Sequence, residues 1–134
     1  MKPILVLFLD TCQALPCSSI WIQLGLDDLG YEYTLDEPRW CYNVYTPSRD
    51  ELDALAKTAQ EKEYDLIVVG NNNSSGLDVV KALPAHLRAR TIVVANALPL
   101  HPSEDHRYRG LGIGQFSERA GSIASRIQRI LELS

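Results

Sequence analysis

Short apolar runs alternate along the chain with longer segments in which apolar residues recur at helical spacing. A short continuous run of β-branched and other apolar residues is typical of a strand that is buried on both faces. Such runs predict strands at residues 4–9, 31–35, 65–70, 91–95 and 111–113. The second of these runs is aromatic as well as β-branched, which is also typical of strands.

The segments between the strands predict helices, at residues 18–29, 48–59, 77–87 and 117–133. Ser48 and Glu51 form a capping box, because each side chain can bond a free backbone N–H group of a first helical turn. Pro84 is expected to kink or end the third helix, and Ser117 to cap the last one. Residues 97–109 carry prolines and histidines and predict a polar loop.

This alternation predicts one α/β domain that spans residues 1–134. Continuous apolar strands need helices on both faces, which gives a three-layer, doubly wound, five-stranded parallel sheet. We expect the flavodoxin-like strand order 2-1-3-4-5. Ligands of such sheets bind beyond the carboxyl ends of the strands, between the first and third strands.

Composition narrows the range of partners. The chain has 134 residues and a net charge of −4, so the bulk charge does not favour nucleic acid or an anionic membrane. The three cysteines are an odd count, and they predict reduced thiols and a cytoplasmic protein. The apolar run at 4–9 is too short for a signal-peptide core or a membrane span.

The chain resembles the receiver domains of bacterial response regulators, and resembles them best in its second half. Residues 65–69 look like the third receiver strand, and residues 76–84 resemble the helix that follows it. Residues 91–97 look like the fourth strand and its end, and residues 112–117 resemble the segment before the last receiver helix. The resemblance implies the receiver (CheY-like) form of the flavodoxin-like fold.

The residues that receivers use for phosphoryl transfer are largely missing. Receivers use an acidic pair after the first strand, an acceptor aspartate after the third, a Ser or Thr after the fourth and a lysine after the fifth. Here these places hold Asp10-Thr11, Gly70-Asn71, Ala95-Asn96-Ala97 and Gly114 or Gln115. The similarity is therefore closer to degenerate pseudo-receivers, which use the fold for protein contacts or ligand sensing.

Cys12 and Cys17 follow the first strand and allow an alternative function. A cysteine at a strand-to-helix turn can have its thiolate stabilised by backbone N–H groups. Low-molecular-weight phosphatases and related arsenate reductases resemble this segment, and the resemblance implies a thiol-dependent enzyme that uses Cys12. However, Ser18 stands where those enzymes carry an arginine, and Pro16 removes one loop N–H group. The simpler interpretation is that both cysteines are small, partly buried apolar residues.

A metal site would need Cys12 and Cys17 together with His101 and His106. Both pairs follow strands on the same edge of the predicted sheet, but their spacing matches no compact zinc motif. We expect no metal and no cofactor.

A small anionic ligand is the third alternative. The predicted binding residues follow the first, third and fourth strands, and they are Asp10, Thr11, Asn71, Asn72, Asn73, Ser74, Ser75 and Asn96. Small polar side chains at a helix start can bond a phosphate group. The same residues are also ordinary turn formers and helix caps.

The leading hypothesis is a non-enzymatic signalling module that binds a protein partner or a second copy of itself. Its expected surfaces are the aromatic segment from Trp40 to Tyr45, the loop at 97–109, and the last strand and helix. The aromatic residues fit a partner surface and a lid over the sheet edge equally well.

Overall fold

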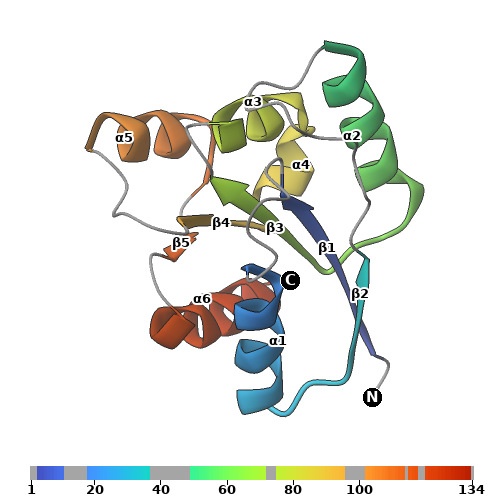
Figure 1. The fold of residues 1–134 in the computed structure, drawn as a ribbon, viewed down its shortest axis with the longest axis vertical. Helices are drawn as coiled ribbons and strands as arrows, with labels where there is room; N and C mark the ends of the chain where they lie inside the picture. The colour runs from blue at the N-terminus through green and yellow to red at the C-terminus, as the bar shows by residue number, and fades with distance from the viewer. Residues whose placement is uncertain are drawn as a thin grey trace.

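A computed structural model of the chain describes residues 3–10, 18–36, 49–71, 75–95, 102–113, 115–117 and 120–133. The described strands form one parallel sheet of five strands in the order β2-β1-β3-β4-β5 (Figure 1). The strands are β1 (Ile4–Asp10), β2 (Tyr33–Asp36), β3 (Leu66–Asn71), β4 (Thr91–Ala95) and β5 (Gln115–Ser117). The predicted three-layer fold and strand order are confirmed.

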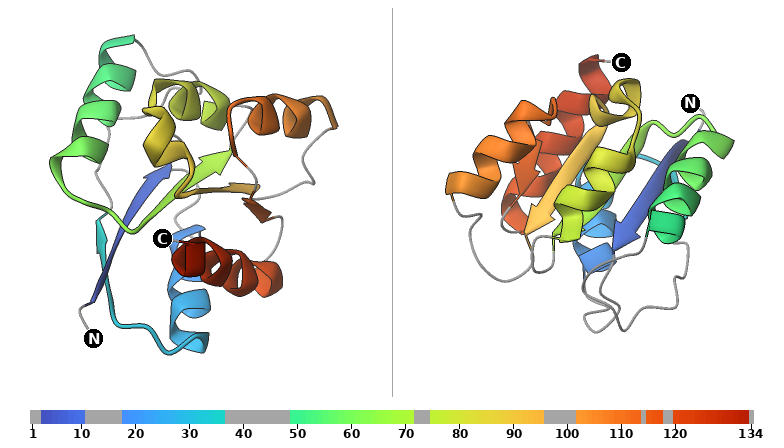
Figure 2. Two further views of the ribbon diagram at one scale, coloured as in Figure 1. Left: turned by 180° about the vertical axis from the view of Figure 1, so that it is seen from behind. Right: turned by 90° about the horizontal axis from the view of Figure 1, so that it is seen from above.

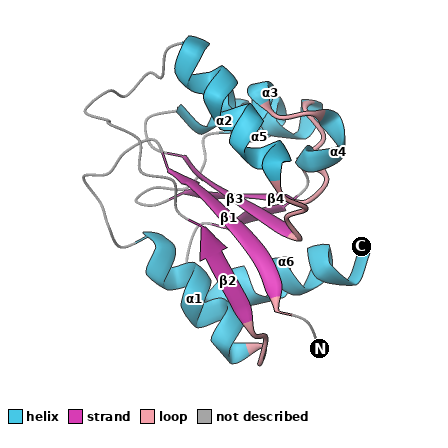
Figure 3. Cartoon of the chain, turned by 90° about the vertical axis from the view of Figure 1, so that its right-hand side faces the viewer, coloured by secondary structure: helices cyan, strands magenta, loops and turns pink. Residues whose placement is uncertain are grey.

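Helices cover both faces of the sheet (Figures 2 and 3). One face carries α1 (Ser18–Asp28) and α6 (Ala120–Leu133). The other carries α2 (Arg49–Glu61), α3 (Ser75–Ala82), α4 (Ala85–Arg88) and α5 (Pro102–Gly110). This arrangement divides the core into two buried clusters, one on each face of the sheet.

Alternating side chains of the central strands explain why their sequences are continuously apolar. In β1, Leu7 and Leu9 belong to the cluster under α2–α5, whereas Val6 and Phe8 belong to the cluster under α1 and α6. Successive side chains of a strand point to opposite faces, so a strand covered on both faces needs apolar residues at every position. β3 follows the same rule, with Ile67 on the first face and Val68 on the second.

The stop predicted at Pro84 is confirmed. Helix α3 ends at Ala82, and Pro84 takes an extended conformation (φ −60°, ψ 153°) before the short helix α4. The Arg88 side chain holds this break. Its Nε donates to the carbonyl oxygens of Val80, at 3.1 Å, and Leu83, at 3.0 Å.

The loop predicted at 97–109 is wrong for most of its length, because residues Pro102–Gly110 form helix α5. Proline is well suited to the first position of a helix, where no backbone N–H group is needed. The helix lacks an apolar stripe in its sequence, and among its described side chains one, Tyr108, is fully buried.

The last strand and helix begin later than predicted. Residues 111–113 close α5 instead of forming a strand, since the N–H groups of Leu111 and Ile113 both donate to the Tyr108 carbonyl at 3.0 Å. Gly112 has a positive φ of 90°, which glycine adopts without strain. Strand β5 follows at Gln115–Ser117, so Ser117 lies in a strand and is not a helix cap.

The predicted capping residue Ser48 lies outside the described residues, while Glu51 lies in the first turn of α2 as expected. In the part of the chain that the structure describes, no helix has both the length and the apolar character to cross a bilayer.

Candidate functional site

The carboxyl ends of β1, β3 and β4 lie side by side. Asp10 of β1 is opposite Gly70 of β3, and Gly70 is opposite Val94 of β4. Asn71 is opposite Ala95. β1 lies between β2 and β3, so the chain winds in both directions from it and this edge is the place where doubly wound sheets bind ligands.

β3 brings no acidic side chain to this edge. Its last two residues are Gly70 and Asn71, and no Asp or Glu occurs from residue 66 to residue 77. Asp65 precedes the strand at its opposite end, where its Oδ2 accepts a hydrogen bond from the Leu5 backbone N–H at 2.9 Å. That carboxylate therefore holds β1 to β3 at the amino ends of the strands.

The structure brings together part of the predicted ligand set. Asp10 and Asn71 end neighbouring strands, and Ser75 is the first residue of α3. The other predicted ligand residues lie outside the described residues, and they are Thr11, Asn72, Asn73, Ser74 and Asn96. The backbone thus places Asp10 and Asn71 at one edge of the sheet, while a ligand site there stays a prediction.

Both cysteines of the enzyme alternative, Cys12 and Cys17, lie outside the described residues, as do His101 and the aromatic segment from Trp40 to Tyr45. His106 is exposed on α5. No three His, Cys, Asp or Glu side chains gather as a metal site within the described ranges.

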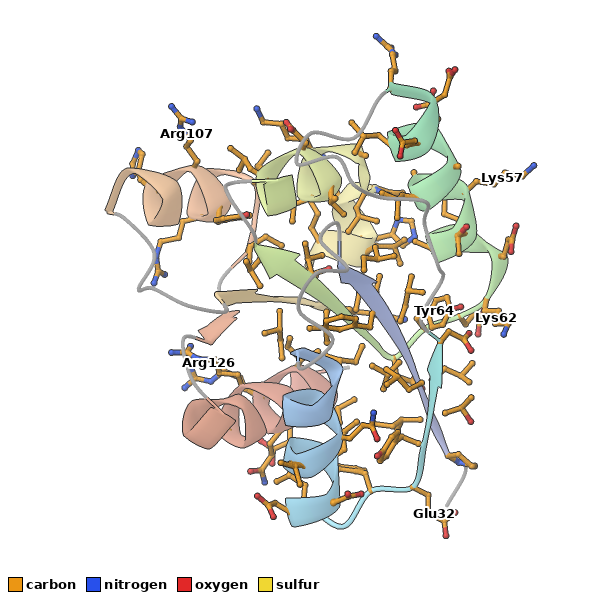
Figure 4. All side chains as sticks on the ribbon, in the orientation of Figure 1. Glu32, Lys57, Lys62, Tyr64, Arg107 and Arg126 are labelled. Atoms are coloured by element: carbon orange, nitrogen blue, oxygen red, sulfur yellow. The ribbon has the colours of Figure 1, made fainter. Side chains whose placement is uncertain are left out.

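A polar cluster at the end of β2 was missed by sequence reasoning. The Tyr64 hydroxyl donates to Oδ2 of Asp36 at 2.6 Å, and Nζ of Lys62 donates to the same oxygen at 2.9 Å. Figure 4 shows Lys62 and Tyr64 side by side next to β2. No spacing motif marks this cluster, because Asp36 is separated from both partners by helix α2.

The cluster has a clear electrostatic character. The Tyr64 hydrogen bond, followed by the one from Lys62, lowers the pKa of Asp36 below its usual value. Burial, followed by the bond to Asp36, raises the pKa of Tyr64. Both shifts keep a protonated phenol donating to an ionised carboxylate. The Arg90 side chain also donates to the Tyr64 carbonyl at 3.1 Å, so the cluster anchors the segment between α2 and β3.

Comparison with known proteins identifies the fold. No family model and no curated protein matches the sequence. Among solved structures, a signal receiver domain of a histidine kinase from Clostridium thermocellum is 15% identical, with a TM-score of 0.66, over 98% of this chain and 99% of that one. A response regulator from Thermotoga maritima is 11% identical, with a TM-score of 0.62, over 98% and 99%. The chain has the receiver fold.

A third similar structure is described as an atypical orphan response regulator with a phosphorylation-independent regulatory mechanism. It is 17% identical, with a TM-score of 0.55, and the match covers 98% of both chains. At these identities the comparisons establish the receiver fold, and the chemistry must be argued from the residues of this chain.

Within a receiver fold, the edge formed by β1, β3 and β4 is the place for phosphoryl chemistry. Asp10 is the only acidic residue from residue 3 to residue 26, where receivers carry a pair. Gly70 and Asn71 end the strand that would carry the acceptor. Gln115 begins β5, next to the place of the receiver lysine, and Gly114 lies outside the described residues.

Proposed function

We propose that this chain is a regulatory module with the receiver fold that acts by binding a protein partner and accepts no phosphoryl group. The observation that carries the proposal is the end of β3. Gly70 and Asn71 lie beside Asp10 of β1, and neither residue has the carboxylate on which an acyl phosphate forms.

The single acid at this edge adds support. Mg²⁺ is held in proteins by oxygen ligands, usually one or two carboxylates together with waters and phosphate oxygens. Asp10 has no acidic neighbour in the sequence and faces Gly70 across the sheet. A cation bound by Asp10 would therefore have no carboxylate beside it on β3 that could accept a phosphoryl group.

The phosphorylation-independent regulator with a similar fold provides a precedent for this kind of module. The proposal includes one domain over residues 1–134, a protein partner rather than nucleic acid or membrane, and a cytoplasmic location that agrees with the odd number of cysteines.

Beryllofluoride with Mg²⁺ tests the proposal, since it mimics a phosphoryl group bound to a carboxylate. We expect the backbone amide signals of Gly70, Asn71 and Ala95 to stay unchanged in ¹H–¹⁵N spectra when both are added. A receiver domain with an acceptor aspartate, titrated in parallel, serves as the positive control. Saturable shifts at the ends of β1 and β3 would contradict the proposal.

A second experiment tests regulation in the source organism. Asp10→Asn removes the one negative charge of this edge while keeping the size of the side chain. We expect the variant, expressed from the native locus, to restore the wild-type phenotype of a deletion strain, because partner binding needs no Mg²⁺-dependent step. A variant that behaves like the deletion, at normal protein level, would contradict a phosphorylation-independent mechanism.

A further inference from the structure

Charge is distributed unevenly along this chain. Residues 1–67 contain twelve Asp and Glu against five Lys and Arg, a net charge of −7. Residues 68–134 contain five Asp and Glu against eight Lys and Arg, a net charge of +3. The strand order places β2, which belongs to the acidic half, and β5, which belongs to the basic half, at opposite ends of the sheet.

One end of the sheet carries a basic edge, which we define as His106 and Arg107 of α5 with Arg126 and Arg129 of α6. These two helices lie on either side of β5, and Figure 4 shows Arg107 above β5 and Arg126 below it, on the same side of the molecule. Three of the four residues are exposed, and Arg126 is partly exposed.

One hydrogen-bond donor of the Arg126 side chain has no acceptor in the described structure. This donor is the Nε atom, which is buried. A buried donor without an acceptor is costly, and guanidinium groups bind carboxylates through paired hydrogen bonds. The Nε atom itself is out of reach of a second molecule, but the residue is partly exposed, so the charge of Arg126 still adds to that of the basic edge.

The opposite end of the sheet carries an acidic edge, which we define as Asp27, Asp28, Glu32, Glu61 and Glu63. All five side chains are exposed. Glu32 precedes β2, and Figure 4 shows it at the end of the sheet away from Arg107 and Arg126. Lys62 lies here as well, but its amino group is bound to Asp36 at 2.9 Å, so it neutralises that carboxylate and not the acidic edge.

The acidic edge also offers contact area. Among the described strands β2 pairs with β1 alone, so it is an edge strand of the described sheet. Tyr31, Tyr33 and Leu35 are only half-buried against the core at this edge. Aromatic residues are enriched in protein interfaces, and an edge strand with half-buried aromatic side chains fits such a contact.

We propose that the chain self-associates head to tail, with the basic edge of one copy bound to the acidic edge of the next. The two edges lie at opposite ends of the sheet and carry opposite charge, so one copy cannot satisfy both edges by itself. The contact is heterologous, because different surfaces of the two copies meet. Each added copy leaves one free edge of each kind, so assembly continues as protein concentration rises.

Salt dependence is the first test. Exposed charges are screened over roughly 10 Å at about 0.1 M salt and over longer distances at lower salt. We expect the average mass of the wild-type chain, measured by sedimentation equilibrium, to rise with protein concentration in about 20 mM salt and to fall toward the monomer above about 300 mM. A monomer at every concentration in low salt would overturn the proposal, whatever other anionic molecule the basic edge then binds.

Charge reversal at each edge is the decisive test. The variant R107E/R129E keeps the acidic edge and loses the basic one, whereas D28K/E32K keeps the basic edge and loses the acidic one. We expect each variant alone to stay monomeric in low salt. An equimolar mixture should associate again, because the intact acidic edge of the first variant can bind the intact basic edge of the second.

Lys81→Glu is the matched control, because Lys81 is exposed on α3 and lies outside both edges. We expect this variant to self-associate like the wild type. Far-UV circular dichroism and thermal unfolding will verify that the variants keep the fold. Self-association of either edge variant alone at the wild-type level, or a mixture that stays monomeric, would overturn the proposal. These outcomes do not depend on phosphoryl chemistry, so they leave the proposed function untouched.

Discussion

Tyr64 connects the end of the second helix of the chain to the edge strand of the sheet. Only 2% of its surface is exposed, and its hydroxyl bonds to Asp36. We expect Tyr64→Phe to lower the free energy of unfolding by about 1–2 kcal/mol, since the ring stays buried while a hydrogen bond to a charged group is lost. Urea denaturation measures this change.

The matched control is Lys62→Ala, which removes the second donor to the same oxygen. The Lys62 side chain is 53% exposed, and exposed ion pairs contribute about 0–1 kcal/mol. A loss for the lysine variant that equals or exceeds the tyrosine loss would show that the salt bridge, and not the phenol, stabilises this corner.

The same cluster predicts how stability depends on pH. The pKa of Asp36 is lower in the folded chain than in the unfolded one, so the folded state favours the ionised form. Its contribution is complete above the unfolded pKa of about 3.9 and disappears as the pH falls through the lower folded value. Below about pH 4, we expect the free energy of unfolding to fall less steeply with decreasing pH in Asp36→Asn than in the wild type. Urea denaturation at a series of pH values measures this dependence. An unchanged slope would contradict the prediction.

Single residues differ in how far their role could be read from the sequence. The missing carboxylate at Gly70 and Asn71 was visible directly, because the apolar run of β3 fixes where the strand ends. The bond between Tyr64 and Asp36 was not, because 28 residues separate them and they meet only when β2 and β3 both pair with β1.

At the level of elements, Arg88 stabilises the break between α3 and α4. Besides its two Nε bonds, its guanidinium donates to the Lys81 carbonyl at 3.0 Å. We expect Arg88→Ala to cost about 1–3 kcal/mol, because carbonyl groups at a helix end lose their donor. Arg88→Lys should recover little, since an ammonium group lacks the planar set of donors.

The comparison for Arg88 is His86→Ala, an exposed position of the same short helix. Surface changes of this kind usually stay within about 0.5 kcal/mol. Equal unfolding free energies for the Arg88→Ala and His86→Ala variants, measured by urea denaturation, would contradict a capping role for Arg88.

Helix α5 depends on one buried aromatic ring among its described side chains. Tyr108 is fully buried in the cluster under α2–α5, whereas Arg107 beside it is exposed. We expect Tyr108→Ala to cost about 3 kcal/mol or more, as large-to-small changes in a core do, and to speed amide exchange throughout α5. Arg107→Ala should change neither quantity noticeably.

The errors of sequence reasoning concentrate at α5 and β5, for a physical reason. A helix anchored by one side chain has no apolar stripe, so periodicity cannot reveal it. Its polar sequence and Pro102 therefore predict a loop. The apolar pair Leu111 and Ile113 predicts a strand, although both residues close the helix through backbone bonds to Tyr108.

At the level of the whole molecule, the architecture was predictable because the same pattern, a short continuous run of apolar residues, recurs along the chain. Each of the runs in β1, β3 and β4 is apolar at successive positions, and only a sheet with two covered faces buries such runs. The distribution of charge between the two ends of the sheet carries no signal in any one segment. The separation of charge can be seen only when the strand order is known, because that order places β2 and β5 at opposite ends of the sheet.

The pairing of β1 with β3 also sets the order in which the chain can fold during synthesis. Val6 pairs with Leu66, sixty residues later, so the inner side of β1 has no strand partner until β3 has left the ribosome. Closing so long a loop costs entropy before any contact repays it. A nascent chain that ends at α2 therefore holds one of its most apolar segments half-paired, at the stage when it is most exposed to aggregation and to chaperones.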